Sequence, residues 1–106
     1  MTIRKAASLL LVDDDPSLLK LFGMRFTSEG FRVTTAESGA EALRVLHRER
    51  IDLVLSDLRM DEMDGMALFA EIQKCQPGMP VIILTAHGSI PDAVAATQQG
   101  VFGFLT

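Results

Sequence analysis

The sequence contains no tryptophan, no tyrosine and a single cysteine among its 106 residues. The missing aromatic residues argue against a stacking platform for nucleic-acid bases. One cysteine, Cys75, excludes an internal disulfide framework and a cysteine-based zinc site. No apolar run approaches the length of a membrane span, and no signal peptide opens the chain. We therefore expect a small soluble domain that resides in the cytoplasm and does not contact a membrane.

Positive charge is also scarce, with 10 basic against 14 acidic residues and a formal net charge of −4. Binding to DNA or RNA depends on basic side chains that neutralise phosphates. We therefore expect no direct nucleic-acid binding by this domain. Hydrophobic residues make up 48% of the chain and charged residues 23%, a composition typical of one folded domain with a buried core.

Apolar runs of strand length alternate with segments of helical periodicity along the chain. The expected strands are 9–12, 31–35, 51–55, 80–84 and 101–105. The intervening helices are expected to begin near residues 16, 39, 65 and 90, and the first and last of them to end at Gly30 and Gly100. This order predicts an α/β fold with a doubly wound, five-stranded parallel sheet and helices on both of its faces. A helix that would cover the fifth strand is absent, so we interpret the chain as truncated.

Polar residues stand directly after three of the expected strands. They are Asp13 and Asp14 after the first, Asp57 after the third and Thr85 after the fourth. Taken singly, each is explained as a helix cap, a turn residue or a strand-end hydroxyl. Together they lie at the carboxyl edge of one parallel sheet, where such folds bind ligands. Converging carboxylates repel one another unless a cation lies among them, and oxygen ligands favour Mg²⁺, so the pattern indicates phosphoryl chemistry.

Four motifs in this order make the chain resemble the receiver (CheY-like) domain of bacterial two-component response regulators over essentially its whole length. They occupy residues 11–16, 57–65, 83–86 and 100–105. Segments 85–89 and 98–100 are similar to the NtrC type, and within that type the sequence resembles the GlrR (QseF) group.

The resemblance implies a role for each acidic residue of the cleft. Asp57 would be the phosphoacceptor, which takes a phosphoryl group from a sensor histidine kinase. Asp14 would bind Mg²⁺ directly, and Asp13 would contribute through a water molecule. The backbone carbonyl of Arg59 would complete the protein ligands of the metal.

The resemblance also implies how the signal is relayed. Thr85 would bond a phosphoryl oxygen, and Phe104 would act as an aromatic switch residue near the output face. The partners would be the kinase and the downstream ATPase and DNA-binding domains of a longer transcription regulator. A receiver of this kind assists its own phosphorylation and dephosphorylation, and we expect no turnover enzyme.

Departures from the family pattern leave two alternatives open. The chain ends at Thr106, one residue before a lysine that the family places near the phosphoryl group, so we interpret residues 1–106 as a truncated receiver domain. One alternative is an interaction module that is not phosphorylated in this form. The other is a Mg²⁺-dependent phosphatase with an aspartate nucleophile, which Arg59 disfavours because such enzymes usually carry an acid at that position.

The uncovered sheet face and open edge strand predict self-association into a homo-oligomer.

Overall fold

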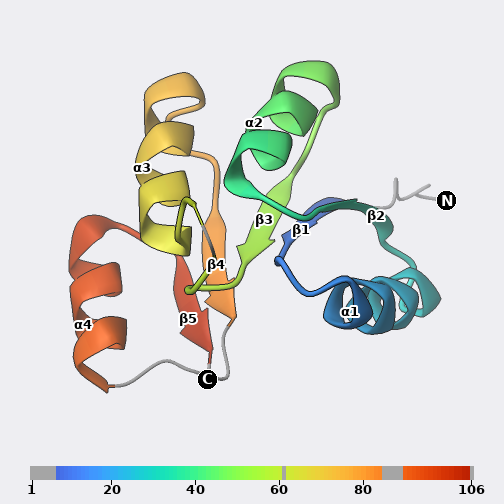
Figure 1. Ribbon diagram of the computed structural model, residues 1–106. Helices are drawn as coiled ribbons and strands as arrows, with labels where there is room; N and C mark the ends of the chain where they lie inside the picture. Colours follow the sequence, from blue (N-terminus) through green and yellow to red (C-terminus); the bar gives the residue numbers. More distant parts are fainter. Residues whose placement is uncertain (1–6, 61, 85–89, 106) are drawn as a thin grey trace, which may run out of the picture.

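The computed structural model describes residues 7–60, 62–84 and 90–105. Within these residues, five strands alternate with four helices (Figure 1). The strands are β1 (Ser8–Val12), β2 (Arg32–Ala36), β3 (Leu53–Ser56), β4 (Val81–Leu84) and β5 (Gly103–Leu105). The helices are α1 (Pro16–Ser28), α2 (Gly39–Arg48), α3 (Gly65–Cys75) and α4 (Ile90–Gln99).

The strands form one sheet in the order β2-β1-β3-β4-β5, and every pair of neighbours is parallel. The predicted fold class, a doubly wound five-stranded parallel sheet, is therefore confirmed. The chain crosses from β2 past β1 to β3, so β1 is the strand at which the winding direction reverses. This reversal leaves a crevice at the carboxyl ends of β1 and β3. Strand β2 lies at one edge of the sheet and β5 at the other.

Two expected strands begin later than the apolar pattern indicates. Strand β3 starts at Leu53, which pairs with Leu9, whereas Ile51 is buried without belonging to the sheet ladder. Strand β5 starts at Gly103, because the Val101 N–H still donates to the Ala96 carbonyl and completes the end of α4. An apolar residue can be buried before the ladder begins, so burial alone does not define a strand boundary.

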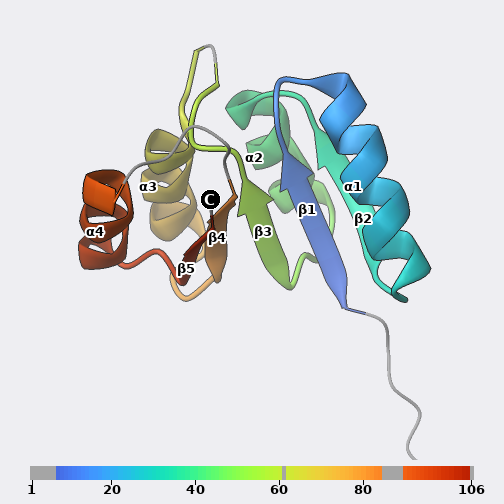
Figure 2. The same cartoon turned by 90° about the horizontal axis from the view of Figure 1, so that it is seen from below.

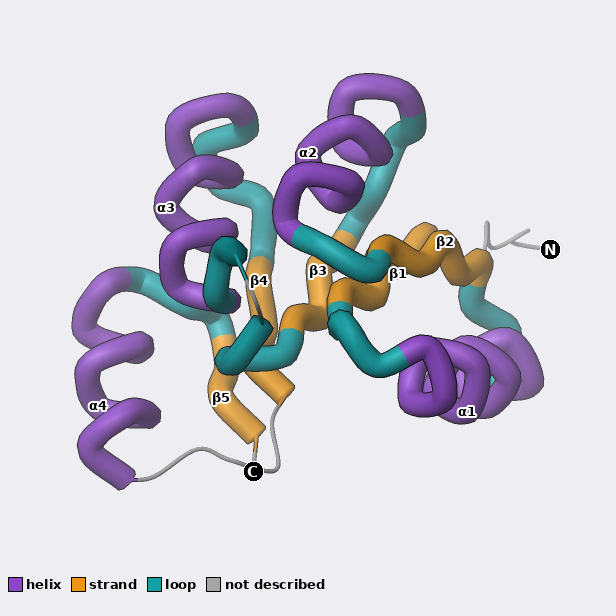
Figure 3. Tube along the Cα trace, in the orientation of Figure 1, coloured by secondary structure: helices purple, strands orange, loops and turns teal. Residues whose placement is uncertain are grey.

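The helices cover the two faces of the sheet unequally. Helix α1 packs on one face, whereas α2, α3 and α4 lie on the other (Figures 1 and 2). The larger buried cluster joins the strands to α2, α3 and α4 through Leu46, Leu68, Ile72 and Ala96. The smaller cluster joins Leu9, Leu11 and Leu55 to α1. The connections that follow β1, β2 and β3 emerge at the same edge of the sheet, which the tube in Figure 3 traces in a single view.

Local hydrogen bonds explain where the helices begin and end. Asp15 caps α1 by accepting from the Ser17 N–H at 2.9 Å, and Asp64 caps α3 by accepting from the Ala67 N–H at 2.8 Å. Gly30 follows α1 with φ 101°, a conformation that side chains with a Cβ rarely adopt, and so it ends the helix as predicted.

Helix α2 begins with a variant of the capping box, the motif in which a cap residue and an acid three residues later each bond a backbone N–H. The Ser38 hydroxyl accepts from the Glu41 N–H at 3.1 Å, as that motif requires. The Glu41 carboxylate, however, accepts from the Glu37 N–H at 3.3 Å, one residue before the cap.

Candidate functional site

The site is built at the carboxyl ends of β1 and β3, which are neighbours in the sheet. Val12 pairs with Ser56, so the residues that follow these two strands leave the sheet at the same level. The backbone ladder extends one step further, because the Asp57 N–H donates to the Val12 carbonyl at 2.9 Å and the Asp13 N–H donates to the Ala36 carbonyl at 3.1 Å. Asp13 and Asp57 therefore start from adjacent backbone positions, and each is fixed by its own hydrogen bond to the end of a neighbouring strand.

Three carboxylates meet at this edge. One oxygen from each of Asp13, Asp14 and Asp57 lies within 4.8 Å of the other two. Asp13 and Asp57 are half-buried, whereas Asp14 is exposed. The structure thus brings together the three acidic residues that the sequence placed at the ends of two separate strands.

Backbone N–H groups hold two of these carboxylates in place. Asp13 Oδ1 accepts from the Asp15 N–H at 2.9 Å, and Asp57 Oδ1 accepts from the Leu58 N–H at 2.8 Å. Each of these hydrogen bonds occupies one oxygen of a carboxyl group that has two. Both side chains are therefore oriented while they keep an oxygen for another ligand.

The electrostatic environment disfavours ionisation of Asp13. Burial is the main cause that raises the pKa of this carboxyl above its ordinary value. The hydrogen bond from Asp15 lowers the pKa and opposes part of this effect. The negative charges of Asp57 and Asp14 raise the pKa further. The cluster therefore carries an unfavourable concentration of negative charge, which a cation would relieve.

The chemistry of the donor set fits a hard divalent cation. All three candidate ligands are carboxylate oxygens from Asp13, Asp14 and Asp57, and neither sulfur nor imidazole belongs to the group. Oxygen ligands of this kind suit Mg²⁺, which usually retains several of its waters when it binds to protein.

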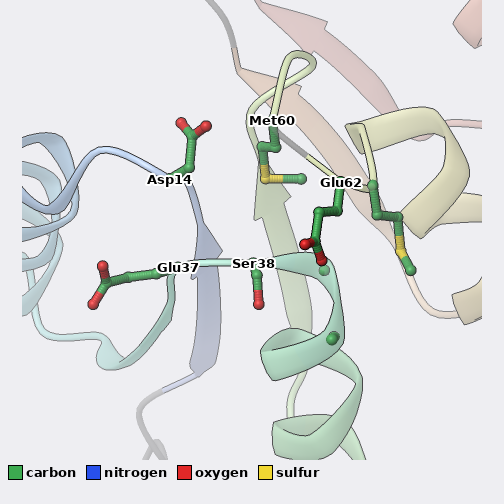
Figure 4. A pocket seen from close by; sticks show the side chains of 8 residues that line it. Asp14, Glu37, Ser38, Met60 and Glu62 are labelled. Atoms are coloured by element: carbon green, nitrogen blue, oxygen red, sulfur yellow. The ribbon is translucent and has the colours of Figure 1, made fainter.

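A cavity of about 350 Å³ borders the cluster on the side of α2 (Figure 4). Asp14 lines one side of it, and the turn before α2 and the loop after β3 line the rest, with Ser38, Met60, Glu62 and Met63 among the residues involved. Figure 4 shows Asp14 and Met60 at the upper rim and the Glu62 carboxylate lower down, above the start of α2. The exposed acid of the cluster is therefore accessible from open space.

The other predicted site residues are placed less completely. Thr85 lies outside the described residues. Phe104 belongs to β5, where its Cα pairs with that of Ile83, but its side chain lies outside the described part of the structure. Arg59 follows Asp57 by two residues, on the loop between β3 and α3, and its side chain is exposed.

Two residues beside Asp57 were given no role at the site by the sequence. Ser56 is only 1% exposed, and its hydroxyl donates to the Asp57 carbonyl oxygen at 2.9 Å. Gly65, the first residue of α3, lies so close to Asp57 that an added Cβ would overlap the same carbonyl oxygen. The signals were the polar Ser56 at the end of the apolar run 53–55 and the place of Gly65 in the motif 57–65, but a serine at a strand end and a glycine at a helix start both have simpler explanations.

The family model for the response regulator receiver domain matches residues 9–106. The chain therefore belongs to the response regulator receiver domain family. This membership confirms the resemblance inferred from the four motifs and defines the class of protein as a signal-receiving module.

Two relatives show which type of response regulator this chain is similar to. The transcriptional regulatory protein GlrR of Escherichia coli (strain K12) is 83% identical over 102 residues, which are 96% of this chain and 23% of that protein. The DNA-binding transcriptional regulator NtrC of Klebsiella pneumoniae is 45% identical over 95 residues, which are 90% of this chain and 20% of that protein. The similarity to the NtrC type and to the GlrR group is thereby confirmed. The chain spans less than a quarter of the length of these relatives.

A solved structure shares the same fold. The response regulator protein TrrA of Thermotoga maritima, in complex with Mg²⁺ and BeF, superposes with a TM-score of 0.85 and 28% sequence identity, covering 94% of this chain and 85% of that one. Among the described residues, no helix is long and apolar enough to cross a membrane.

Proposed function

We propose that the chain, residues 1–106, is a receiver domain that works as the phosphoryl-accepting switch of a two-component system in the bacterial cytoplasm. Asp57 is the proposed phosphoacceptor. The observation that carries this proposal is the cluster of Asp13, Asp14 and Asp57 at the carboxyl ends of β1 and β3 in a chain of the receiver family. The phosphoryl donor is a phosphohistidine on a sensor kinase.

The proposed cofactor is Mg²⁺, held by Asp13, Asp14, Asp57 and the backbone carbonyl of Arg59. Support comes from the all-oxygen donor set and from TrrA, the relative that was solved with Mg²⁺ and BeF. When bound, the ion would neutralise the negative charge of the carboxylates and of the incoming phosphoryl group.

The chain's own residues prepare the nucleophile. The Leu58 N–H holds one oxygen of Asp57, and the other oxygen of the same carboxylate would attack the phosphorus atom. The new O–P bond forms as the P–N bond to the donor histidine breaks, and the imidazole leaves as a neutral ring after it takes up a proton. Thr85 is proposed to bond a phosphoryl oxygen, and Phe104 to relay the change toward an output domain.

The kinase would dock beside this cleft. Helix α1 starts directly after the acidic cluster and exposes three large apolar side chains at intervals of three residues. Leu18, Leu21 and Met24 are 38%, 60% and 65% exposed. Residues spaced by three lie on one side of a helix, so they form an apolar stripe that an incoming helix can cover.

Further partners follow from the longer relatives. In an NtrC-type parent protein, the switch would act on a downstream ATPase domain and on a DNA-binding domain.

We also propose that the isolated domain self-associates, because β2 and β5 are edge strands and Phe102, which is 76% exposed, lies beside β5. Light scattering after size-exclusion chromatography should show a mass that rises with concentration, and a constant monomer mass would refute self-association.

The domain is proposed to be a signalling module without enzymatic turnover. A Mg²⁺-dependent phosphatase would need an acid or base two residues after its nucleophile, where this chain has Arg59. Sustained release of phosphate from a simple phosphoester, abolished in Asp57→Asn, would favour the phosphatase instead. A folded protein that takes up no phosphoryl group at all would favour the pure interaction module.

Intact-mass measurement after incubation with acetyl phosphate and Mg²⁺ tests the central proposal. The wild type should gain the mass of one phosphoryl group, and Asp57→Asn should gain none. Asp52→Asn is the matched control, because Asp52 is an exposed aspartate outside the cluster whose carboxylate accepts from the Ser8 N–H. Equal labelling of the wild type and Asp57→Asn would refute the assignment of the phosphoacceptor.

Calorimetric titration tests the metal ligands separately. Mg²⁺ affinity should fall sharply in Asp14→Ala and in Asp57→Ala, because each substitution removes one of the three oxygens that lie within 4.8 Å of one another. Wild-type affinity in both variants would eliminate the proposed metal site.

A further inference from the structure

Strand β3 ends in a hydroxyl that is buried among apolar neighbours. Ser56 pairs with Val12 on one side and with Ile83 on the other, and it is 1% exposed. A buried hydroxyl is costly unless it forms a hydrogen bond. The Ser56 hydroxyl forms its bond with the next residue, donating to the Asp57 carbonyl oxygen at 2.9 Å.

Gly65 approaches the same carbonyl oxygen from α3. It is buried, and its N–H donates to the Leu58 carbonyl at 2.8 Å. A Cβ at this position would overlap the Asp57 carbonyl oxygen and come within 3.1 Å of the Leu58 Cα. Only a glycine lets the start of α3 pack this closely against the turn that follows β3.

These contacts act on one rigid unit. The Asp57 carbonyl and the Leu58 N–H belong to the same planar peptide group, so the direction of one sets the direction of the other. The Leu58 N–H in turn donates to Asp57 Oδ1 at 2.8 Å. Contacts made by Ser56 and Gly65 with the carbonyl end of this plane therefore control the N–H that orients the carboxylate.

We infer that Ser56 and Gly65 are positioning residues for phosphoryl transfer to Asp57. They act through the peptide plane between Asp57 and Leu58, and neither contacts the phosphoryl donor. The inference rests on the proposed function, since it concerns the rate at which Asp57 accepts a phosphoryl group. Small errors in the orientation of a nucleophile slow such a step strongly, whereas donor binding depends on other groups.

The first test compares removal of two hydroxyls. Initial rates of phosphoryl uptake are measured by intact mass across a range of acetyl phosphate concentrations at saturating Mg²⁺. Ser56→Ala should lower the maximal rate about threefold or more and leave the half-saturating donor concentration unchanged. Thr34→Val is the control, because its hydroxyl also donates a hydrogen bond, to Glu49 at 2.8 Å, but in a different part of the sheet. Its maximal rate should equal that of the wild type.

The second test compares two glycine substitutions. Gly65→Ala forces the Asp57 carbonyl to move and should lower the maximal rate about tenfold or more. Gly23→Ala is the control in α1, where an added Cβ would meet its nearest neighbours at an ordinary 3.9 Å. Circular dichroism establishes that each variant is folded, and if Gly65→Ala fails to fold, the result for Ser56→Ala decides.

The outcomes separate the inference from the function on which it rests. A wild type that takes up no phosphoryl group refutes the proposed function. Uptake by the wild type, with the same maximal rate in folded Ser56→Ala, refutes the positioning role and leaves the function intact. A change in the half-saturating concentration alone would also refute it, because that result would place Ser56 in donor binding.

Discussion

Replacing Asp13 with asparagine should stabilise the folded protein in the absence of divalent cations. Burial, reinforced by the charges of Asp57 and Asp14, raises the pKa of the Asp13 carboxyl, so its ionised form is less favourable in the folded state than in the unfolded state. Asparagine has nearly the same shape, and its Oδ1 can still accept the 2.9 Å hydrogen bond from the Asp15 N–H. The substitution therefore removes the repulsion and keeps the local structure.

The spacing of the oxygens gives the size of the contribution from charge repulsion, which adds to that of burial. Two unit charges 4.8 Å apart repel by about 0.9 kcal/mol in a medium as polar as water. Asp13 faces two such charges, but Asp14 is exposed and its contribution is screened by salt. We expect Asp13→Asn to raise the free energy of unfolding by about 1 kcal/mol at pH 7 and low ionic strength.

The sign of the pH dependence follows from the raised pKa. Between the unfolded and folded pKa values of Asp13, the folded state holds more protons than the unfolded state, so the stability of the wild type falls as the pH rises through this range. The stabilisation by Asp13→Asn should therefore be largest at pH 7. It should shrink as the pH falls toward the ordinary carboxyl pKa of about 4.

Urea unfolding followed by circular dichroism measures this difference, with a chelator present. Glu71→Gln is the matched control, because it removes one negative charge from an exposed pair with Lys74 outside the cluster. It should leave the stability nearly unchanged. Saturating Mg²⁺ should stabilise the wild type more than Asp13→Asn and so reduce or reverse the advantage of the variant. An unchanged or lower stability of Asp13→Asn without Mg²⁺ would refute the reasoning.

Three further predictions concern the scaffold around the site. Ile72→Ala should lower the free energy of unfolding by about 2–5 kcal/mol, because the side chain is fully buried between α3 and the sheet, and a smaller loss in urea unfolding would contradict this. Asp64→Ala should cost about 1 kcal/mol, since it removes the cap that accepts from the Ala67 N–H, and an unchanged melting temperature would show that the cap is dispensable. Gly39→Ala should cost about 1–3 kcal/mol, because its Cβ would lie 2.6 Å from Met63 Sδ. Combining it with Met63→Ala should cost less than the sum of the single losses, and strict additivity would show that the two residues do not compete for space.

Most of the fold could be predicted because its signals are local. Buried parallel strands appear in the sequence as continuous apolar runs, and the run 9–12 forms the buried part of β1. The end of α1 at Gly30 could be predicted from a single residue, because glycine tolerates the positive φ that follows the helix. The later start of β3 at Leu53 could not be predicted, because it depends on which residue pairs with Leu9 on another strand.

The sequence alone determined that acidic residues follow two buried strands and that parallel winding brings those strand ends to one edge. Only the tertiary structure decided how closely the three carboxylate oxygens approach, and that Ser56 and Gly65 meet at the Asp57 carbonyl. The physical reason lies in the range of the interactions. Periodicity and capping act within a few residues of the chain, whereas the packing of α3 against the end of β3 depends on the register and shape of elements that meet only in the folded protein.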